Sequence, residues 1–451
     1  MSRGLGDVYK RQVTDPLGNK TIIDYNDAGL PMTIIGPTSA TVQIEYDELG
    51  RILSVKDPLK KFSRYEYLDI TALPKKIVTD GTSVLYDYDS NYNLISIGLD
   101  NRIIGEFNYT PNGLIRSMRG VGQTEQTFDY HPDGRLKSVA NALGHKTLFD
   151  YDLRGNLIRE TNPLGGVIVR CYDTQNRLVS ETGPVGDETR YKYDAQGRLE
   201  SMTITDGGVT RYEYDKAGRL IAETDPSGRT TRYHYDAAGR LVKTIYPDKN
   251  EERYRYDQSG NLIELIDQWA GAYHYKYDAA GKLLREIRPG GLEVKYDYDA
   301  QGNLDFLEDS SGVRSQFQYD SLNRITLATD SLGGTVKYLY DPLGYVVSET
   351  DPLGGMKSFS YNANGILMGV YYSNGDEVRY EYNPTGLMIA AHRPSGGITR
   401  FEYDEMGNLA SEKDPLGNES RYAYDLAGRV LAFTDGEGGV TRFHYDAVGK
   451  L

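Results

Sequence analysis

The stretch Tyr193-Asp194-Ala195-Gln196-Gly197-Arg198-Leu199 is one copy of a phrase that recurs along the whole 451-residue chain. The next two copies begin at Tyr214-Asp215 and Tyr235-Asp236. The tyrosine of this phrase returns every 21 residues, from Tyr25 to Tyr445, without an insertion or a deletion. A fixed period over the whole chain indicates one structural unit that is copied many times.

The residue four places after the tyrosine indicates a tight turn. It is glycine in nearly every copy, and the exceptions are Thr71, Tyr92, Asn176 and Asn323. Glycine and asparagine are the residues that enter the left-handed backbone region most readily, so we expect a positive φ at this position. The residues that we expect to carry the repeat signature in representative copies are Tyr193, Asp194, Gly197, Leu199, Tyr214, Asp215, Gly218, Leu220, Tyr235, Asp236, Gly239, Leu241, Tyr403, Gly407, Tyr424 and Gly428.

The residues that lead into each tyrosine alternate between aromatic and polar. Tyrosine or phenylalanine stands two places before the key tyrosine in almost every copy, and the departures are Ile23, Ile44 and Arg170. Alternation at period two predicts a β-strand with one aromatic face. The opposite face carries polar residues such as Arg190, Arg211, Arg232 and Arg253, beside Lys192, Glu213, His234 and Arg255.

A second turn lies about half a period further on. Its copies include Asp225-Pro-Ser-Gly228, Asp351-Pro-Leu-Gly354, Asp414-Pro-Leu-Gly417 and Asp309-Ser-Ser-Gly312. Asp first, Pro second and Gly fourth is the composition of a type I turn. Asp341-Pro-Leu-Gly344 carries the same phrase in the first turn, so we expect the two turns to share one geometry. The sequence therefore predicts an all-β antiparallel meander of 21-residue hairpin repeats, without helix, that forms a long curled sheet, spiral or hollow shell.

The composition of the chain limits which architectures and which classes of partner are expected. The net charge is −14, from 51 basic and 65 acidic residues, and a nucleic-acid binder needs a basic footprint, so we expect no nucleic-acid partner. Hydrophobic residues make up 39% of the chain and include 39 tyrosines, which favours one exposed sheet over a thick sandwich. No apolar run approaches the roughly 18–20 residues of a membrane span. Cys171 is the only cysteine, so we expect no disulfide and no thiolate metal site.

The two ends depart from the repeat. Residues 8–10 read Val-Tyr-Lys where Gly-Arg-Leu is expected, although the phase is already correct at Asp15-Pro-Leu-Gly18. We therefore expect residues 1–12 to be a non-native or unassigned leader, and residues 13–451 to be one continuous array of repeats. Because the chain stops on Gly449-Lys450-Leu451 in the middle of a phrase, we expect the array to be cut at both ends.

Candidate catalytic and metal-binding groups are scattered. The six histidines are His131, His145, His234, His274, His392 and His444. Catalysis would need a positioned partner for one of them, and we expect none to be catalytic. The turn aspartates are expected to cap their own turns through Asx hydrogen bonds rather than to bind calcium, and we expect no cofactor. Trp269, the sole tryptophan, falls in a predicted turn, where it could stack on a sugar ring or cover its neighbour.

From residue 13 onward, the recurring tyrosine, turn glycine and following aliphatic residue resemble the YD-repeat, or Rhs, family. The resemblance implies a β-strip that spirals into a hollow shell, similar to the toxin-enclosing shells of Rhs polymorphic toxins and Tc toxin complexes and to the extracellular shell of teneurins. It implies encapsulation or adhesion, a secreted or cell-surface location and no catalysis by the repeats. Toxin-type members end their shell in an Asp-Pro-x-Gly phrase at which the chain cuts itself. Here the phrase stands at ordinary turn positions, including Asp15, Asp351 and Asp414, and we interpret it as a turn.

Simple geometry is compatible with a shell. Two strands for each tyrosine give roughly 42 strands, which at about 4.8 Å spacing make a ribbon about 200 Å long. Sheets of more than about ten strands usually curl. A ring whose circumference equals this length would leave an interior roughly 45 Å in diameter. This is enough for a folded domain of about 100 residues. Our first hypothesis is containment of a toxin domain encoded beyond residue 451, and the alternative is an adhesive surface that binds cell-surface carbohydrate or protein.

Overall fold

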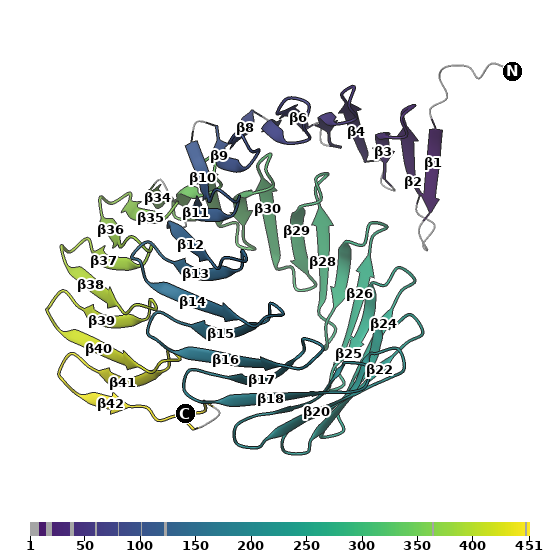
Figure 1. The fold of residues 1–451 in the computed structure, drawn as a ribbon. Coiled ribbons are helices and arrows are strands. Elements are labelled where there is room, and N and C mark those ends of the chain that lie inside the picture. Colours follow the sequence, from purple (N-terminus) through teal and green to yellow (C-terminus); the bar gives the residue numbers. More distant parts are fainter. Residues whose placement is uncertain are drawn as a thin grey trace. The chain divides into compact units, whose positions relative to one another are not determined.

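The computed structural model describes residues 9–14, 20–36, 40–58, 61–79, 81–100, 102–120, 124–362, 365–446 and 449–451. These residues contain 42 β-strands and no helix (Figure 1). The strands form one antiparallel sheet in which each strand pairs with the next along the chain. The predicted all-β meander is therefore confirmed. Within the described residues there is consequently no helix that could cross a membrane.

The chain forms two compact units, one made of residues 1–104 and 234–356 and the other of residues 105–233 and 357–451. The strands of the first unit are β1 (Tyr9–Thr14), β2 (Lys20–Tyr25), β3 (Pro31–Ile35), β4 (Thr41–Tyr46), β5 (Ile52–Lys56), β6 (Phe62–Tyr67), β7 (Pro74–Thr79), β8 (Thr82–Tyr88), β9 (Leu94–Leu99), β23 (Leu241–Ile245), β24 (Glu251–Tyr256), β25 (Leu262–Ile266), β26 (Ala272–Tyr277), β27 (Leu283–Ile287), β28 (Glu293–Tyr298), β29 (Leu304–Asp309), β30 (Arg314–Tyr319), β31 (Ile325–Thr329), β32 (Thr335–Tyr340) and β33 (Val346–Thr350).

The strands of the second unit are β11 (Ile115–Gly120), β12 (Gln126–Tyr130), β13 (Leu136–Ala140), β14 (Lys146–Tyr151), β15 (Leu157–Thr161), β16 (Val167–Tyr172), β17 (Leu178–Thr182), β18 (Glu188–Tyr193), β19 (Leu199–Thr203), β20 (Val209–Tyr214), β21 (Leu220–Thr224), β35 (Leu367–Tyr372), β36 (Glu377–Tyr382), β37 (Met388–His392), β38 (Ile398–Tyr403), β39 (Leu409–Lys413), β40 (Glu419–Tyr424), β41 (Val430–Thr434) and β42 (Val440–Arg442). The unit boundaries fall inside β10 (Arg102–Tyr109), β22 (Thr230–Tyr235) and β34 (Met356–Tyr361).

The two turns of each repeat share one hydrogen-bond pattern. In the turn after the key tyrosine, here called the tyrosine turn, Asp194 N donates to Arg198 O at 2.8 Å and Gly197 N donates to Asp194 O at 3.0 Å. In the half-period turn, Asp225 N donates to Arg229 O at 3.0 Å and Gly228 N donates to Asp225 O at 2.9 Å. The glycine φ angles are 84° and 78°. This is the three-residue hairpin loop built from a type I turn and a left-handed residue, as predicted.

Among the hairpins whose register the described residues give, the bulge belongs to the tyrosine hairpin. Tyr193 pairs with Leu199, but Lys192 pairs with Ser201, so β19 has one extra residue at this point. The half-period hairpin of β21 and β22 pairs Thr224 with Thr230 and continues without a shift. The same shift recurs at the key tyrosine of other repeats throughout the array. Bulges bend a strand and increase its local twist, so one bulge per repeat makes the sheet curl steadily.

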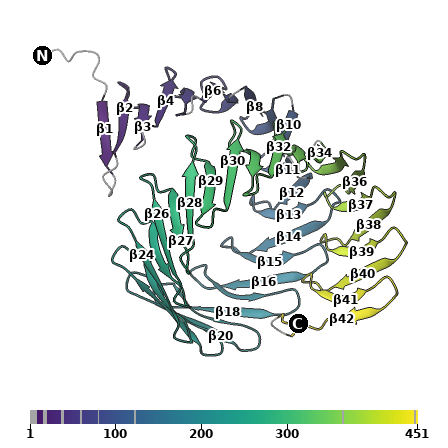
Figure 2. The ribbon, with the colours of Figure 1, turned by 180° about the vertical axis from the view of Figure 1, so that it is seen from behind.

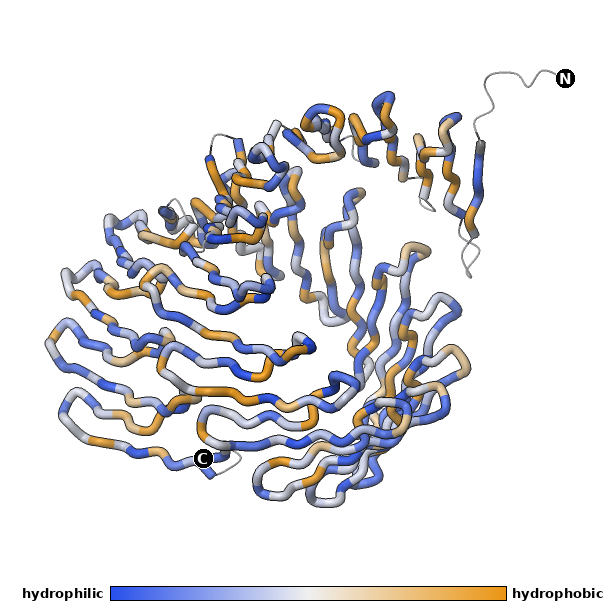
Figure 3. Tube along the Cα trace, in the orientation of Figure 1, coloured by the Kyte–Doolittle hydropathy of each residue, from blue (hydrophilic) through white to orange (hydrophobic). Residues whose placement is uncertain are grey.

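The two faces of the sheet differ as the alternation predicted. In β18, Tyr191 and Tyr193 are half-buried on one face, whereas Arg190 and Lys192 are exposed on the other. No large side chain is fully buried in the described residues, and the most buried apolar side chains are small, such as Ala222 and Ala390. Figure 3 accordingly shows short hydrophobic and hydrophilic stretches alternating along the trace. The sheet is a thin wall without a thick core.

The left-handed turn position is confirmed at three of the four exceptions to glycine. Tyr92, Asn176 and Asn323 have φ of 63°, 61° and 60°. The prediction is wrong for Thr71. That turn is one residue longer, because Leu68 N donates to Leu73 O, and the positive φ falls on Asp69 at 46°. The chain recovers the 21-residue period at the next hairpin, where Thr79 pairs with Thr82.

The N-terminal end begins with a strand inside the segment that we set apart from the array. β1 pairs with β2 from Tyr9–Tyr25 to Thr14–Lys20. Residues 9–12 thus have the pairing of a repeat strand although they lack the phrase. Residues 1–8 and the Asp15-Pro-Leu-Gly18 turn lie outside the described residues, and the boundary at residue 12 stays a prediction.

In the second unit, stretches that are far apart in the sequence lie side by side. Figures 1 and 2 both place β12–β16 beside β36–β42. A hydrogen bond of 2.8 Å from Asn162 Nδ2 to Leu426 O joins the two stretches across 264 residues. The curl of the sheet therefore brings a half-period turn of one stretch against a tyrosine turn of the other.

Candidate functional site

In many repeats the key tyrosine ties its repeat to the one before it. The pairing of β17 with β18 ends at Ser180–Arg190, and beyond this point the Tyr193 hydroxyl donates to Leu178 O at 2.8 Å. The hydroxyl thus bonds a carbonyl at the point where the ladder has stopped. The same bond, 15 residues back along the chain, joins Tyr214 to Leu199 at 3.0 Å, Tyr403 to Met388 at 2.8 Å and Tyr424 to Leu409 at 2.8 Å.

The aspartate that follows the tyrosine organises the turn. Asp194 Oδ1 accepts hydrogen bonds from the main-chain amides of Gln196 and Arg198, both at 2.9 Å, which is the expected Asx capping. Asp194 Oδ2 accepts a bond of 2.7 Å from Arg198 Nε. Partial desolvation raises the pKa of Asp194, but the bonds from Arg198 outweigh it, so the pKa lies below its ordinary value.

Arg198 extends this cluster into the next repeat. Its guanidinium lies 4.7 Å from the ring centroid of Tyr214, and its Nη1 donates to Asp215 O at 3.0 Å. The stacked arginine recurs in other repeats, at Arg177 over Tyr193, Arg240 over Tyr256, Arg324 over Tyr340 and Arg429 over Tyr445. We call this arrangement of Tyr, Asp and Arg the inter-repeat clasp. Sequence reasoning missed the role of the arginine, although its recurrence directly after the turn glycine was the available signal.

The signature residues are distributed over successive repeats and do not meet at a single site. Leu199, Leu220 and Leu241 are the first residues of β19, β21 and β23. The φ angles of Gly218, Gly239, Gly407 and Gly428 are 85°, 84°, 88° and 80°. Tyr235 and Asp236 occupy the same positions in their repeat, and the main-chain amide of Arg240 makes the largest contribution to lowering the pKa of Asp236. The candidate functional element is therefore a periodic wall, and the clasp is its repeated joint.

The histidines lie in separate strands and turns, and three of them contact one acceptor each. His392 Nε2 lies 2.6 Å from Glu381 Oε1, His274 Nδ1 lies 3.4 Å from Glu264 Oε1, and His131 Nε2 lies 2.9 Å from Phe149 O. Across the described ranges, no group of three or more His, Cys, Asp or Glu side chains could hold a metal ion. Cys171 is exposed.

Trp269 stands on a rigid half-period turn. Asp267 Oδ1 accepts hydrogen bonds from the amides of Trp269 and Gly271 at 2.9 and 2.8 Å. The tryptophan is 77% exposed, so its indole is accessible. Stacking on a sugar ring and covering of a neighbour both stay predictions.

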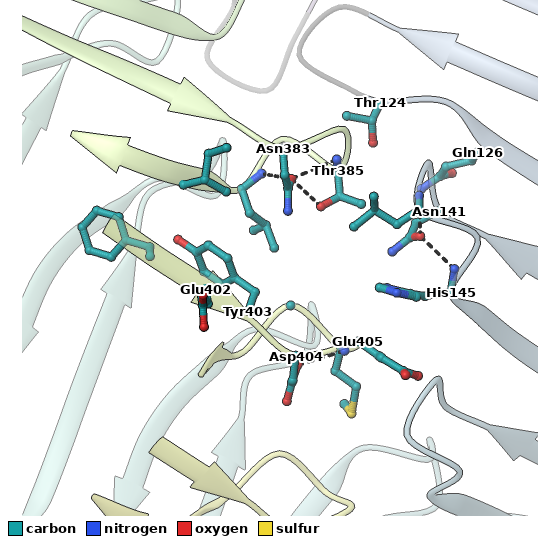
Figure 4. Close-up of a pocket in the computed structure, with 16 residues that line it drawn as sticks. Thr124, Gln126, Asn141, His145, Asn383, Thr385, Glu402, Tyr403, Asp404 and Glu405 are labelled. Carbon is teal, nitrogen blue, oxygen red and sulfur yellow. Dashed lines mark hydrogen bonds between the residues drawn. The ribbon is translucent and has the colours of Figure 1, made fainter. Parts of the chain in front are cut away.

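A cleft of about 450 Å³ opens in the second unit between the two stretches that the curl brings together (Figure 4). One wall comes from the hairpin around Asn141 and His145, and the other from the tyrosine turns that begin at Asn383 and Asp404. The Oδ1 atoms of three lining residues accept hydrogen bonds from main-chain amides of their own turns. These residues are Asn141, Asn383 and Asp404. Sequence reasoning did not anticipate this cleft, because its walls are more than 200 residues apart.

Two family models match the chain. The RHS repeat model matches residues 130–167, 172–210, 200–228, 214–251 and 424–451. The teneurin YD-shell model matches residues 266–401. No curated protein matches the sequence.

Solved structures match over most of this chain at low identity. The crystal structure of TcdB2-TccC3 matches with a TM-score of 0.65 and 13% identity, over 97% of this chain and 31% of the other. The Tc holotoxin pore of Photorhabdus luminescens with a mutated TccC3 matches with a TM-score of 0.59 and 14% identity, over 92% of this chain and 27% of the other. TcdB2-TccC3 without its hypervariable C-terminal region matches with a TM-score of 0.56 and 14% identity, over 96% of this chain and 32% of the other. At these identities the likeness concerns the fold, and this chain spans about a third of the length of each structure.

A single antiparallel sheet of repeated hairpins defines an all-β tandem-repeat protein. The chain belongs to the Rhs, or YD-repeat, family, because the 21-residue phrase, both family models and the fold agree.

Proposed function

We propose that the chain is a wall segment of a YD-repeat shell that encloses a toxin domain lying outside residues 1–451 and helps to deliver it. The observation that carries this proposal is the inter-repeat clasp, which recurs along the array and joins neighbouring hairpins into a wall with two different faces. The matching fold of TcdB2-TccC3 supports it. In this role the repeats are structural, need no cofactor and act outside the cell.

The containment proposal is tested on the complete open reading frame. Its flanking coding sequence is read first, and any domain of about 100–150 residues that follows the repeats is the proposed cargo. The complete protein is then treated with protease, and cleavage inside that domain is followed by mass spectrometry. We expect protection in the wild type and in Gly218→Asn, and cleavage in Gly218→Val, which strains the wall. Equal cleavage of the domain in the intact protein and as a free fragment would overturn containment.

A second candidate function is adhesion to a cell-surface carbohydrate or protein, which the 77% exposure of Trp269 favours. An accessible indole on a rigid turn can stack on the apolar face of a sugar ring. The test is a glycan array probed with the wild-type chain and with Trp269→Ala. Adhesion through this residue predicts a bound glycan that the variant loses. A wall anchor in the flanking coding sequence, without a following domain, would also favour adhesion over containment.

A further inference from the structure

In the second unit, two successive half-period turns of one stretch face two successive tyrosine turns of the other. We call this boundary the seam. The turn Asn141–His145 and the turn Asp404–Gly407 both line the cleft, so the seam is open there. One repeat further along, the turn Asn162–Gly166 touches Leu426, so the seam is closed there. The two half-period turns differ at their second residue, Ala142 or Pro163, and at their last, which is His145 in one and Gly166 in the other.

Asn162 uses both ends of its side-chain amide. Its Oδ1 accepts a hydrogen bond of 2.8 Å from Gly166 N, which closes its own turn. Its Nδ2 donates the bond of 2.8 Å to Leu426 O on the other stretch. Aspartate closes the corresponding turn at Asp351 through the same kind of bond, but a carboxylate has no hydrogen to donate. The contact across the seam therefore requires asparagine.

Gly166 allows the close approach of the two stretches. It is buried, and a Cβ atom added to it would lie 2.5 Å from Leu426 O and 2.6 Å from Asn162 Nδ2. Gly166 does not have a positive φ, so its backbone conformation is open to other residues and does not require glycine. Glycine is needed here because the Leu426 carbonyl lies so close. Any larger side chain would displace either this carbonyl or the Asn162 amide that binds it.

We propose that Asn162 and Gly166 form a latch for the Leu426 carbonyl, and that this latch fixes which turns of the two stretches meet at the seam. The two residues act together, since the glycine brings the carbonyl within reach and the asparagine binds it. The neighbouring turn supports this division of roles, because Asn141 is present there but His145 replaces the glycine and the seam stays open. The latch is a property of the wall itself and holds whether or not the wall encloses a polypeptide.

A latch of this kind opens reversibly. It consists of one neutral hydrogen bond at the surface, which contributes modestly compared with the ladders on either side. The amides of the tyrosine turn at Asp425–Arg429 are held by bonds within that turn, and the contact at Leu426 restrains the local openings through which they exchange. Hydrogen exchange reports such local openings directly.

The experiment is hydrogen–deuterium exchange with mass spectrometry on the whole chain, followed in the peptide that spans residues 422–430. We expect Gly166→Ala to raise its exchange several-fold. The matched control is Gly355→Ala, which occupies the same turn position, and whose added Cβ would meet only the side chain of Asp351 within its own turn. This control is expected to leave the exchange of residues 422–430 unchanged.

A second variant separates loss of the latch from general misfolding. Asn162→Asp keeps the Asx turn, because aspartate fills this position in other repeats of the chain, but it removes the donor. We expect it to raise exchange in residues 422–430 as Gly166→Ala does, while exchange in distant strands stays at the wild-type level. Wild-type exchange of residues 422–430 in both variants would overturn the latch. This outcome would not touch the containment proposal, which is tested on the complete reading frame.

Discussion

At the scale of single residues, the key tyrosine and the aromatic residue two places before it have different structural roles. The key position is tyrosine in every copy from Tyr25 to Tyr445, whereas the position two places earlier also accepts phenylalanine, as at Phe317 and Phe401. The key hydroxyl bonds a main-chain carbonyl of the preceding repeat, as Tyr193 does with Leu178. The earlier position supplies an aromatic ring to the same face, and a ring needs no hydroxyl for that.

This difference predicts the effect of removing single hydroxyls. Tyr193→Phe leaves the Leu178 carbonyl without its donor and is expected to destabilise the chain by about 1 kcal/mol. Tyr191→Phe, which imitates natural copies of the repeat, is expected to be close to neutral. Urea denaturation followed by circular dichroism measures both. Equal losses in the two variants would contradict the role assigned to the key hydroxyl.

The turn aspartates predict a response to acid. Hydrogen bonds hold the pKa of Asp194, Asp215 and Asp236 below the ordinary value, and the main-chain amide of Arg219 is the largest contributor at Asp215. A carboxyl whose pKa is lowered by folding stabilises the protein above its unfolded pKa of about 3.9 and loses that contribution as the pH falls through the folded value. We therefore expect the urea midpoint to be level above about pH 5 and to fall steeply below about pH 4.

The matched control for the acid response replaces carboxyls by amides. Asparagine already serves in tyrosine turns at Asn362 and Asn383, where its Oδ1 accepts the same turn bonds. Asp194→Asn combined with Asp215→Asn should lower the midpoint at neutral pH, because the ion pairs with arginine are lost, and should make the fall below about pH 4 shallower. An unchanged slope would mean that other carboxyls dominate the acid response.

At the scale of the turn, the glycine is required for its backbone conformation and not for space. Gly218 has φ of +85°, and an added Cβ would meet nothing within 4 Å. Gly218→Val is therefore expected to cost about 1–2 kcal/mol through backbone strain alone. Gly218→Asn should cost much less, because Asn176 and Asn323 adopt this conformation in the same chain. Denaturation midpoints check the ranking, and equal costs for valine and asparagine would contradict it.

The sequence predicted the turns well but could not distinguish their consequences. The phrase Asp-Pro-Leu-Gly occupies a tyrosine turn at Asp341 and a half-period turn at Asp351, and both form the same hydrogen bonds. Yet the ladder shifts by one residue beside the tyrosine turn, where Tyr340 pairs with Val346, and shows no shift beside the half-period turn of the same phrase at Asp414, where Lys413 pairs with Glu419. The four turn residues therefore do not determine the bulge by themselves.

At the scale of the whole molecule, each hairpin is bonded mainly to its sequence neighbours. Stability in such an array is close to a sum of repeat terms and nearest-neighbour terms, so damage stays local. We expect Gly218→Val to raise hydrogen exchange in β19–β22 and to leave β38–β40 near the wild-type level. Mass spectrometry of exchanged peptides checks this. A uniform rise over all strands would show that the array unfolds as one cooperative block.

The Asx turns and the two unequal faces could be predicted because each depends on a few neighbouring residues. The clasp was only half predicted: tyrosine and aspartate were recognised, but Arg198 reaches Tyr214 and Asp215 only after two hairpins have formed. The cleft beside His145 could not be predicted, because nothing in a single repeat says which distant turn will face it. The longer turn at Leu68–Leu73 was missed because the next hairpin hides the insertion within the 21-residue period.

The sequence by itself determined the hairpin repeat, the antiparallel order of the strands and the two faces of the wall. These features follow from turn chemistry and period-two alternation, which act between residues close in the chain. Only the tertiary structure decided that Asn162 meets Leu426 across 264 residues. Such a contact depends on the small bend and twist that every bulge adds to the sheet. The two residues stand about a dozen repeats apart in the chain, so no local pattern specifies where they meet.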